Sequence, residues 1–473
     1  MRHHFTLSLK KTVVVHEHGD DLVLAGQGVK PVRLIKPNNA LKCLLSKLTA
    51  GGMTADQLCQ SVIHEDAGTD LARLYYVIAS FEKKNFICYT LALGGKNLVT
   101  LELISPTFVM EQASVDVQYR LSRFACLRRL ADSTLLESPL GHARLWVHES
   151  LVGAAIALLA MPHSAMELAR RLPELDVAHA GALLSLLCSS GAAFACTDDG
   201  DIAEDNNAAL QQWEFHDLFY HSRSRAGRHE YPLEGNFRFL DSLPALPAVK
   251  PAMSERRIAL YKPDMAALAL GDVPFSRVSE SRRSIRSQAE QAISAVQLGE
   301  FLYRSARIKV VNPVAPAHGA HYESSMRLCP SGGAMHGLEL YLTISRCDGI
   351  VPGFYHYDPQ DHLLEHLSDL GALHQTLLAD GCGAAGLQAQ PDVLITLAAR
   401  FGRTSWKYQS IAYSLILKDT GALYQQMYLV ATAMNLTPCG LGGGNSDLFA
   451  KAAGLDYYAE TSVGEFLLSG KTS

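Results

Sequence analysis

Trp406-Lys407-Tyr408 places an amine and a phenol side by side, at the head of a strand-like run from Ile411 to Lys418. Three more segments carry the residue types that hold a flat, phosphorylated ligand. They are Arg282-Arg283-Ser284-Ile285-Arg286, Pro330-Ser331-Gly332-Gly333 and Cys439-Gly440-Leu441-Gly442-Gly443-Gly444. None of the four is specific alone, but their order and spacing favour one binding site assembled from all of them.

Lys407 and Tyr408 have the chemistry of a proton-transfer pair. A lysine in an apolar, partly buried pocket can act as a base, and a tyrosine can carry a proton or hold an anion. Neighbours on a strand point to opposite faces, so both can reach one ligand only if the backbone turns there. Arg403-Thr404-Ser405 is typical of a loop and makes such a turn feasible. The alternative is an ordinary lysine at a strand end.

The arginine-rich segment predicts an anion site. In an extended run, residues two apart lie on one side, so Arg282, Ser284 and Arg286 could converge on one anion such as a flavin phosphate. The planar guanidinium grips phosphate oxygens two at a time. A solvated basic turn is the alternative.

The two glycine-bearing segments allow main chain to approach a flat ring closely. Ser331 adds a hydroxyl, and His336 and Glu339 follow at the start of a strand. Any tight turn would use Ser-Gly-Gly, and Gly440 to Gly444 could be the loop that caps a helix ending near Leu436. Neither segment fits GxGxxG after a strand, which argues against a Rossmann site.

Length and composition indicate a globular protein of several units. The chain has 473 residues, 48% hydrophobic and 19% charged, and domains usually hold roughly 100 to 200 residues. A formal net charge of −5 argues against binding to nucleic acid or an anionic membrane surface, since both require a basic surface.

Cysteine usage and hydropathy favour the cytoplasm. The ten cysteines are scattered singly without a CxxC pair, which indicates reduced thiols. The longest apolar run, Leu151 to Met161, has about half of the ~20 residues that a membrane helix needs. His216 and His221 fall on different helix faces and do not suit a shared metal. We therefore expect no membrane segment and no metal site.

A proline-rich stretch, residues 242–251, separates two halves. The N-terminal half contains a pattern of three helices followed by strands, twice, which resembles tandem winged-helix units. The first copy is expected at Leu41 to Leu48, Thr54 to Ile63, Asp70 to Phe81, Phe86 to Leu93 and Leu98 to Leu103, and the second at Glu149 to Ala160, Ser164 to Leu172, Val177 to Cys188 and Ala192 to Thr197. The predicted parts are residues 1–110, 111–205, 206–255 (an aromatic-rich helical bridge and the linker) and 256–473.

Winged helices commonly bind DNA. The candidate recognition helix of the second copy, Val177 to Leu184, has no lysine or arginine to meet phosphate or guanine. Peptide or subunit docking is therefore favoured over DNA reading, with plain scaffolding as a third option.

The C-terminal half alternates strands and helices, which predicts an α+β architecture. Ser294 and Gln297 form a capping box before a helix whose Leu298, Phe301, Leu302 and Ser305 share a face. The other expected elements are a half-buried strand from Leu338 to Ile344, a hairpin of Phe354 to Tyr357 with His362 to Glu365, strands from Val393 to Ala398 and Ile411 to Lys418, and a central helix from Leu423 to Asn435.

Together these motifs resemble the nitroreductase superfamily and, within it, the SagB-type dehydrogenases of thiazole/oxazole-modified peptide biosynthesis, including cyanobactin thiazoline oxidases. The likeness covers about residues 205 to 470 well. The segments that carry the likeness are Arg282 to Arg286, Pro330 to His336, Gly353 to Pro359, Trp406 to Tyr408 and Ser462 to Phe466, with Trp213 to Arg225 before them.

The resemblance implies an FMN-binding α+β domain that forms a homodimer, with flavin sites built from both chains. It implies that Lys407 and Tyr408 are the catalytic pair. The flavin contacts that it implies are Arg282, Arg283, Ser284, Arg286, Pro330, Ser331, Gly332, Gly442 and Gly443. The family often has Gly-His and Gln-Asn where this chain has Gly421-Ala422 and Gln425-Gln426, and an aromatic residue where it has Gly444, so the flavin edge or the substrate preference can differ.

The function implied is FMN-dependent oxidation of peptide thiazolines or oxazolines to thiazoles or oxazoles, with a cyclodehydratase as a candidate partner. Two alternatives stay open from the sequence: an NAD(P)H-dependent nitroreductase-like flavin reductase, and a non-catalytic peptide-binding scaffold in which the winged units do the work.

Overall fold

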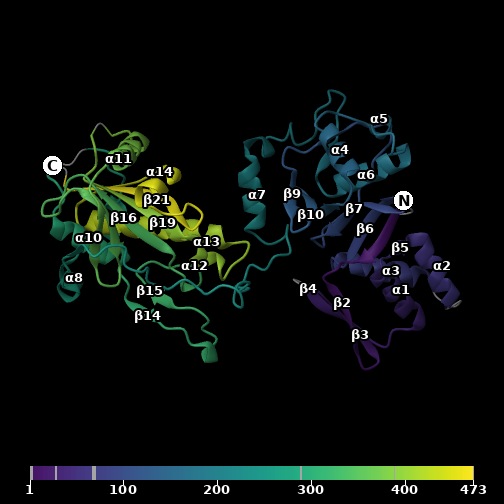
Figure 1. Ribbon diagram of the computed structural model, residues 1–473, viewed down its shortest axis with the longest axis horizontal. Helices are drawn as coiled ribbons and strands as arrows, with labels where there is room; N and C mark the ends of the chain where they lie inside the picture. The colour runs from purple at the N-terminus through teal and green to yellow at the C-terminus, as the bar shows by residue number, and fades with distance from the viewer. Residues whose placement is uncertain (1–3, 27–28, 66–70, 288–289, 388, 472–473) are drawn as a thin grey trace. The chain divides into compact units, whose positions relative to one another are not determined.

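The computed structural model describes residues 4–26, 29–65, 71–287, 290–387 and 389–471 (Figure 1). These form two compact units, Met1–Leu233 and Glu234–Ser473. The four-part division expected from the sequence is finer than this and stays a prediction.

The first unit is built on a seven-stranded antiparallel sheet in the order β5-β1-β6-β7-β11-β10-β9. Alternating burial places Phe5, Leu7 and Leu9 of β1 in the core, so this edge of the sheet is fixed by apolar residues at every second position. The strands are β1 (Phe5–Leu9), β5 (Met53–Thr54), β6 (Ile87–Leu93), β7 (Lys96–Leu103), β9 (Cys126–Leu130), β10 (Ser133–Glu137) and β11 (Ala143–Val147).

Six helices occupy the positions expected from the sequence. They are α1 (Asn39–Thr49), α2 (Ala55–Glu65), α3 (Leu71–Lys83), α4 (Ser150–Leu158), α5 (Ala165–Arg171) and α6 (Val177–Ser189). Two of these helices begin with a capping box: Thr54 and Gln57 exchange bonds, as do Ser164 and Glu167. Asp70, the expected start of the third helix, lies outside the described residues.

The strands after the helices are confirmed in the first copy and differ in the second. The expected Phe86 to Leu93 and Leu98 to Leu103 correspond to β6 and β7, which pair with each other. In the second copy, β12 (Ala193–Ala195) pairs instead with β8 (Tyr119–Leu121), which precedes the helices. Ala193 lies opposite Leu121, 72 residues earlier in the chain. A three-stranded sheet of β2 (Val13–His18), β3 (Asp21–Gly26) and β4 (Val29–Leu34) was not predicted.

Helix α6 is buried rather than presented to solvent. Every residue from Ala180 to Ser189 is buried, so most of the expected recognition helix packs inside the unit. After it come η1 (Leu210–Gln212) and α7 (Phe215–Arg223), the expected aromatic-rich helix.

The second unit is a seven-stranded antiparallel sheet in the order β13-β18-β17-β16-β19-β21-β20, covered by helices on both faces (Figure 1). Helices α10 (Ala295–Ala306) and α13 (Ala412–Ala433) pack on one face, and α11 (Ala372–Ala385) and α14 (Ser446–Ala453) on the other. The strands are β13 (Arg257–Ala259), β16 (Leu338–Ile344), β17 (Gly353–Asp358), β18 (Leu363–Ser368), β19 (Val393–Arg400), β20 (Thr437–Gly440) and β21 (Glu460–Ser469). This confirms the predicted α+β architecture.

Smaller elements lie around this sheet. They are α8 (Met265–Gly271), α9 (Phe275–Ser281), α12 (Phe401–Ser405), β14 (Val310–Asn312), β15 (Ser324–Met326), η2 (Pro316–His318) and η3 (Gly332–Ala334). Among the described residues, no helix combines the length and apolar character needed to span a bilayer.

One strand prediction in this unit was wrong, and another was right in position but wrong in its burial. The run from Ile411 to Lys418 is the first part of the 22-residue helix α13, because a short apolar run fits a buried helix as well as a strand. The strand Leu338 to Ile344 is real, but every residue in it is buried, since helices cover both faces of the sheet. Gly440 ends a strand, β20, so the glycine run that follows is not a helix cap.

Candidate active site

Lys407 and Tyr408 lie in a tight turn between α12 and α13. Their backbone N–H groups donate to the Thr404 carbonyl at 3.2 and 3.0 Å. The backbone turn that the sequence required is therefore present, although no strand follows. A methyl group on Gly333 would lie 2.4 Å from Tyr408 Oη and 2.7 Å from Lys407 Nζ, so both polar atoms meet over this one glycine.

The loop beneath them has an unusual backbone. Gly333 has φ of +61°, and the non-glycine residues Ala334 and His336 have φ of +56° and +43°. Left-handed backbone at non-glycine residues persists only where the surroundings hold it, and it is concentrated at functional sites.

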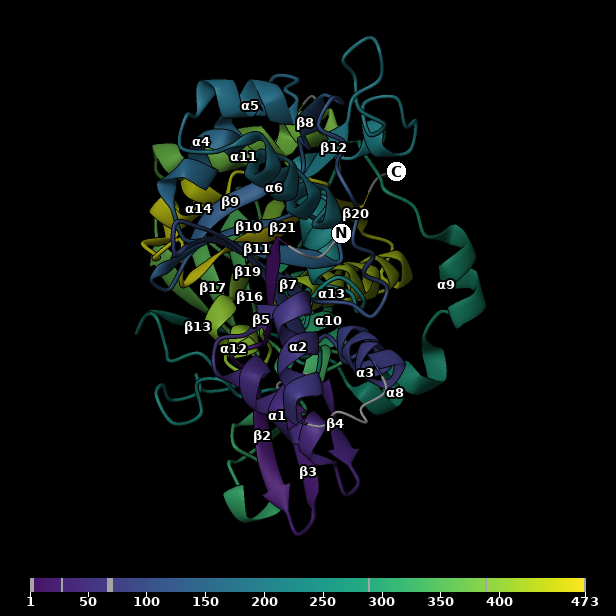
Figure 2. The same ribbon diagram turned by 90° about the vertical axis from the view of Figure 1, so that its right-hand side faces the viewer.

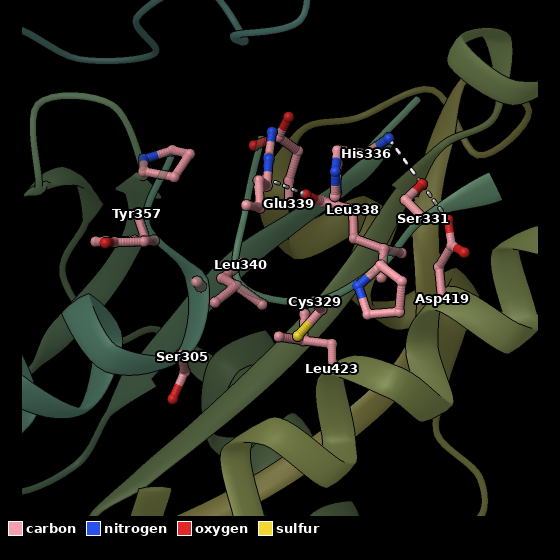
Figure 3. Close-up of a pocket in the computed structure, with 14 residues that line it drawn as sticks. Ser305, Cys329, Ser331, His336, Leu338, Glu339, Leu340, Tyr357, Asp419 and Leu423 are labelled. Carbon is pink, nitrogen blue, oxygen red and sulfur yellow. Dashed lines mark hydrogen bonds between the residues drawn. The ribbon is translucent and has the colours of Figure 1, made fainter. Parts of the chain in front are cut away.

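Asp419 of α13 holds the Pro330–Gly333 loop (Figure 3). Ser331 Oγ donates to one carboxylate oxygen at 2.6 Å, and the Gly332 N–H donates to the other at 3.1 Å. The His336 N–H in turn donates to Ser331 Oγ at 2.9 Å. Burial raises the pKa of Asp419, and these two bonds oppose the shift. The loop is thus tied to the helix that begins just after Lys407 and Tyr408.

Behind the loop lies a cavity of about 40 Å³ between α10, β16 and α13 (Figure 3). This exceeds the roughly 15 Å³ that a water molecule needs but is too small for a three-ring ligand. Ser305, His336 and Glu339 are among its lining residues. Burial, reinforced by nearby arginines, lowers the pKa of His336 to about 4, so this imidazole is neutral at pH 7.

The arginine segment lies at the other end of α13. The Arg282 guanidinium sits 5.2 Å from the ring centre of Tyr428, and the Ser284 and Tyr428 hydroxyl groups are 2.7 Å apart. The Ile285 N–H donates to the Pro438 carbonyl at 2.9 Å, which joins this segment to β20. Arg286 lies beside Cys439, where it opposes the burial that raises the pKa of that thiol.

Arg283 and Arg286 are exposed, and within the described ranges no carboxylate pairs with either of them or with Arg282. Arg282 and Ser284 both contact Tyr428, whose hydroxyl also meets the Gly440 N–H, and Arg286 lies beside the neighbouring Cys439. The convergence of these three residues on one anion stays a prediction.

The glycine run begins beside the same tyrosine. The Gly440 N–H donates to Tyr428 Oη at 2.7 Å. Gly442 and Gly443 are exposed, and a methyl group on either would meet nothing within 4 Å. The Glu465 carboxyl occupies the space that a side chain at Gly444 would need, which accounts for glycine there.

Helix α13 connects the two halves of the site. Asp419 contacts the Ser331 loop and Tyr428 contacts the arginine segment and Gly440. Asp419 and Tyr428 are nine residues apart, which corresponds to roughly 14 Å along the helix. The loop under the Lys-Tyr pair and the basic segment are therefore held at separate places on the same helix.

These residues fit a flavin mononucleotide in kind. Guanidinium groups without a carboxylate partner among the described residues, together with exposed glycine backbone, suit a phosphate at one end. An amine, a phenol and a close-packed glycine suit a ring at the other. The Ser331 and Gly332 donors already bind Asp419, so ring contacts through them would compete with that carboxylate.

Three residues around this site were not predicted. Tyr322 receives a hydrogen bond from Lys407 Nζ at 2.6 Å, Phe237 places its ring centre 5.7 Å from the same atom, and Asp419 holds the loop. All three lie far from their partners in sequence, and no local pattern marks them.

Three parts of the chain match models of known protein families. Residues 1–111 match the ThcOx helix turn helix domain, residues 119–230 match the cyanobactin oxidase ThcOx, and residues 280–466 match the nitroreductase family.

Two curated relatives resemble part of the chain, and so do several solved structures, among them a nitroreductase. The "Putative nitroreductase MJ1384" of Methanocaldococcus jannaschii is 27% identical over 180 residues, 38% of this chain and 81% of that protein. The microcin B17-processing protein McbC of Escherichia coli is 23% identical over 240 residues, 48% of this chain and 83% of that protein. A crystal structure of a "putative nitroreductase" from Ralstonia eutropha superposes with a TM-score of 0.36 at 20% identity, over 49% of this chain and 98% of its own.

The fold of the second unit and the match over residues 280–466 define an oxidoreductase of the nitroreductase superfamily, a family that generally binds flavin. The matches over residues 1–111 and 119–230 narrow this further: both are to cyanobactin-oxidase domains, and they support a SagB-type azoline oxidase of that superfamily. The resemblance inferred from the motifs is confirmed.

Proposed function

We propose that this protein oxidises thiazoline or oxazoline rings of a peptide to thiazoles or oxazoles, with FMN as cofactor, during biosynthesis of a modified peptide. The observation that carries the proposal is the meeting of Lys407 Nζ and Tyr408 Oη over Gly333. An amine and a phenol converging on one point suit proton abstraction beside a redox cofactor.

The FMN contacts divide between the two ends of α13. Arg282, Arg283, Ser284 and Arg286 hold the phosphate, with Gly442 and Gly443 supplying nearby backbone. Pro330, Ser331 and Gly332 lie at the ring end. Within the described residues, none of these three guanidinium groups has a carboxylate partner, which supports the phosphate assignment.

The chemistry is loss of two hydrogens from a five-membered ring. The Cα proton of an azoline is acidified by the adjoining imine and carbonyl, and Lys407 or Tyr408 removes it while the other holds or passes on the proton. FMN, when bound, supplies an acceptor for the hydride that leaves Cβ. The product ring is aromatic, which provides the driving force.

A homodimer and a peptide substrate complete the proposal. Leu270 of α8 is 93% exposed and Phe275 of α9 is 74% exposed, and α8 has no buried residue. Helix α9 stands at the right-hand edge of Figure 2. We call α8 and α9 the α8 arm. Its exposed apolar side chains fit an interface with a second copy of the chain. The first unit docks the peptide or a cyclodehydratase, and the protein acts in the cytoplasm.

Mass spectrometry tests the reaction. The purified protein is incubated with a synthetic peptide that carries one thiazoline, and the peptide mass is followed for loss of two hydrogens. Lys407→Ala should keep its yellow colour and form no thiazole, whereas Lys451→Ala, a change at an exposed lysine of α14, should leave turnover intact. Turnover by Lys407→Ala would remove this residue from the mechanism.

A further inference from the structure

Tyr322 lies against the catalytic lysine without belonging to any of the four segments that define the site. It stands in the loop between η2 and β15 and is partly buried. Lys407 Nζ donates to its hydroxyl oxygen at 2.6 Å, and that hydroxyl donates to the Gly333 carbonyl at 2.9 Å.

The direction of these two bonds follows from the chemistry of a phenol. A tyrosine hydroxyl has one proton to donate and lone pairs that accept. Since the Gly333 carbonyl can only accept, it takes the proton, and Tyr322 presents lone pairs alone to Lys407. The hydroxyl therefore ties the amine to the same glycine over which Tyr408 Oη lies.

The rest of the lysine is enclosed by neighbouring groups. The ring centres of Tyr322, Tyr408 and Phe237 lie 4.8, 5.2 and 5.7 Å from Nζ, within the range of cation–π attraction. The Asn236 and Phe237 N–H groups donate to the Lys407 carbonyl at 3.0 and 3.3 Å. Gly235 packs so closely on the side chain that a methyl group there would lie 2.9 Å from Lys407 Cε.

Phe237 adopts an uncommon backbone to take part in this enclosure. Its φ is +49°, in the left-handed region that aromatic residues rarely adopt. Its ring packs against Tyr322 and Trp406, with centroids 6.3 and 5.8 Å away. The packing of Gly235 on the side chain, the two bonds to the Lys407 carbonyl and the three aromatic rings restrict the lysine. The Tyr322 hydroxyl determines where its nitrogen points.

We propose that Tyr322 is a positioning residue that holds the Lys407 amine beside the Tyr408 hydroxyl for proton transfer. The inference rests on the proposed function for the role of Lys407 and adds a third residue to the site. It predicts that the hydroxyl, and not the ring, is what turnover requires.

The test compares Tyr322→Phe with Tyr458→Phe in the full-length, flavin-loaded protein. Tyr322→Phe keeps the ring, and Tyr458 is 86% exposed on the same unit and serves as the control. Two properties are measured: kcat and KM with a peptide that carries one thiazoline, and acetylation of Lys407 by acetic anhydride relative to exposed Lys451, quantified by peptide mass spectrometry.

Tyr322→Phe is expected to lower kcat about tenfold, the low end for loss of a hydrogen bond to a charged group, with KM and flavin content within about twofold. Lys407 acetylation should rise severalfold, because an amine that is no longer held against the Tyr322 hydroxyl is freer to meet the reagent. Tyr458→Phe should change neither property.

Unchanged Lys407 acetylation in Tyr322→Phe would overturn the inference, whether or not kcat falls, because the hydroxyl would then act on something other than the lysine. Wild-type kcat in Tyr322→Phe would overturn it as well. The acetylation measurement needs no turnover, so a protein that fails to oxidise the thiazoline would refute the proposed function and still report on Tyr322.

Discussion

Gly333→Ala separates the catalytic geometry from the stability of the fold. The alanine methyl group would lie 2.4 Å from Tyr408 Oη and 2.7 Å from Lys407 Nζ, whereas real contacts are essentially never shorter than 3.0 Å. The two atoms that must move are the ends of side chains, so the clash is relieved by displacing them. A misplacement of about 1 Å can cost about a hundredfold in rate.

The matched control is Gly454→Ala at the end of α14. Gly454 has φ of +64°, close to the +61° of Gly333, and a methyl group there meets nothing within 4 Å. Both alanines pay the same left-handed backbone penalty, roughly 1 kcal/mol. Urea unfolding should therefore show similar losses of stability in the two variants.

Only Gly333→Ala should lose turnover, by about a hundredfold against Gly454→Ala, with the thiazoline peptide as substrate. Turnover of the two variants within threefold of each other would show that the displaced amine and phenol are not the catalytic groups.

Three further predictions concern the cofactor, the buried charges and the oligomer. Arg286→Ala should mainly weaken FMN retention, measured by fluorescence of released flavin, and unchanged affinity would contradict the phosphate assignment. His356 donates to Glu339 and Glu365 inside the sheet, and His356→Ala should cost about 3 kcal/mol in urea unfolding, because the two buried carboxylates lose the imidazole that they share and are left with Arg400 and Arg257 as ion-pair partners. Burial opposes both pKa shifts, yet the hydrogen bonds hold the pKa of Glu339 below its usual 4.5 and the pKa of His356 above its usual 6.5. The stability advantage of the wild type over His356→Ala should therefore be fully present from about pH 4.5 to 6.5, decrease at lower pH as the carboxylates protonate, and decrease at higher pH as the imidazole loses its proton. A constant difference from about pH 3.5 to 8.5 would argue against the network. Leu270→Glu should shift the protein toward monomer in analytical ultracentrifugation, and an unchanged dimer would exclude the α8 arm as the contact.

Local signals predicted the parts of the fold that depend on neighbouring residues. The Ser294–Gln297 capping box, and the buried face formed by Leu298, Phe301 and Leu302, are present as expected. Strand β1 was missed although Phe-Thr-Leu-Ser-Leu alternates as a half-buried strand should. The run from Ile411 was assigned to a strand because eight mostly apolar residues carry too few turns to show a helical period.

The site was predictable only where residue types alone carry chemistry. Lys407, Tyr408 and the glycines stood out by type, and the structure brings the Lys-Tyr pair together with Gly333. Tyr322 and Asp419 lie 85 and 88 positions from their hydrogen-bond partners, and a contact over that separation leaves no periodic trace in a single sequence. The contacts of Arg282 and Ser284 with Tyr428 are of the same kind, and Ser284 and Tyr428 are 144 positions apart.

Anaerobic mixing distinguishes oxidation of an azoline from reduction by a nicotinamide. The flavin-loaded protein is combined, without oxygen, with either the thiazoline peptide or NADPH, and the yellow colour is followed. Rapid bleaching by the peptide is expected, with none by the peptide in Lys407→Ala and little by NADPH. Rapid bleaching by NADPH with no response to the peptide would contradict azoline oxidation and favour a nitroreductase-like flavin reductase.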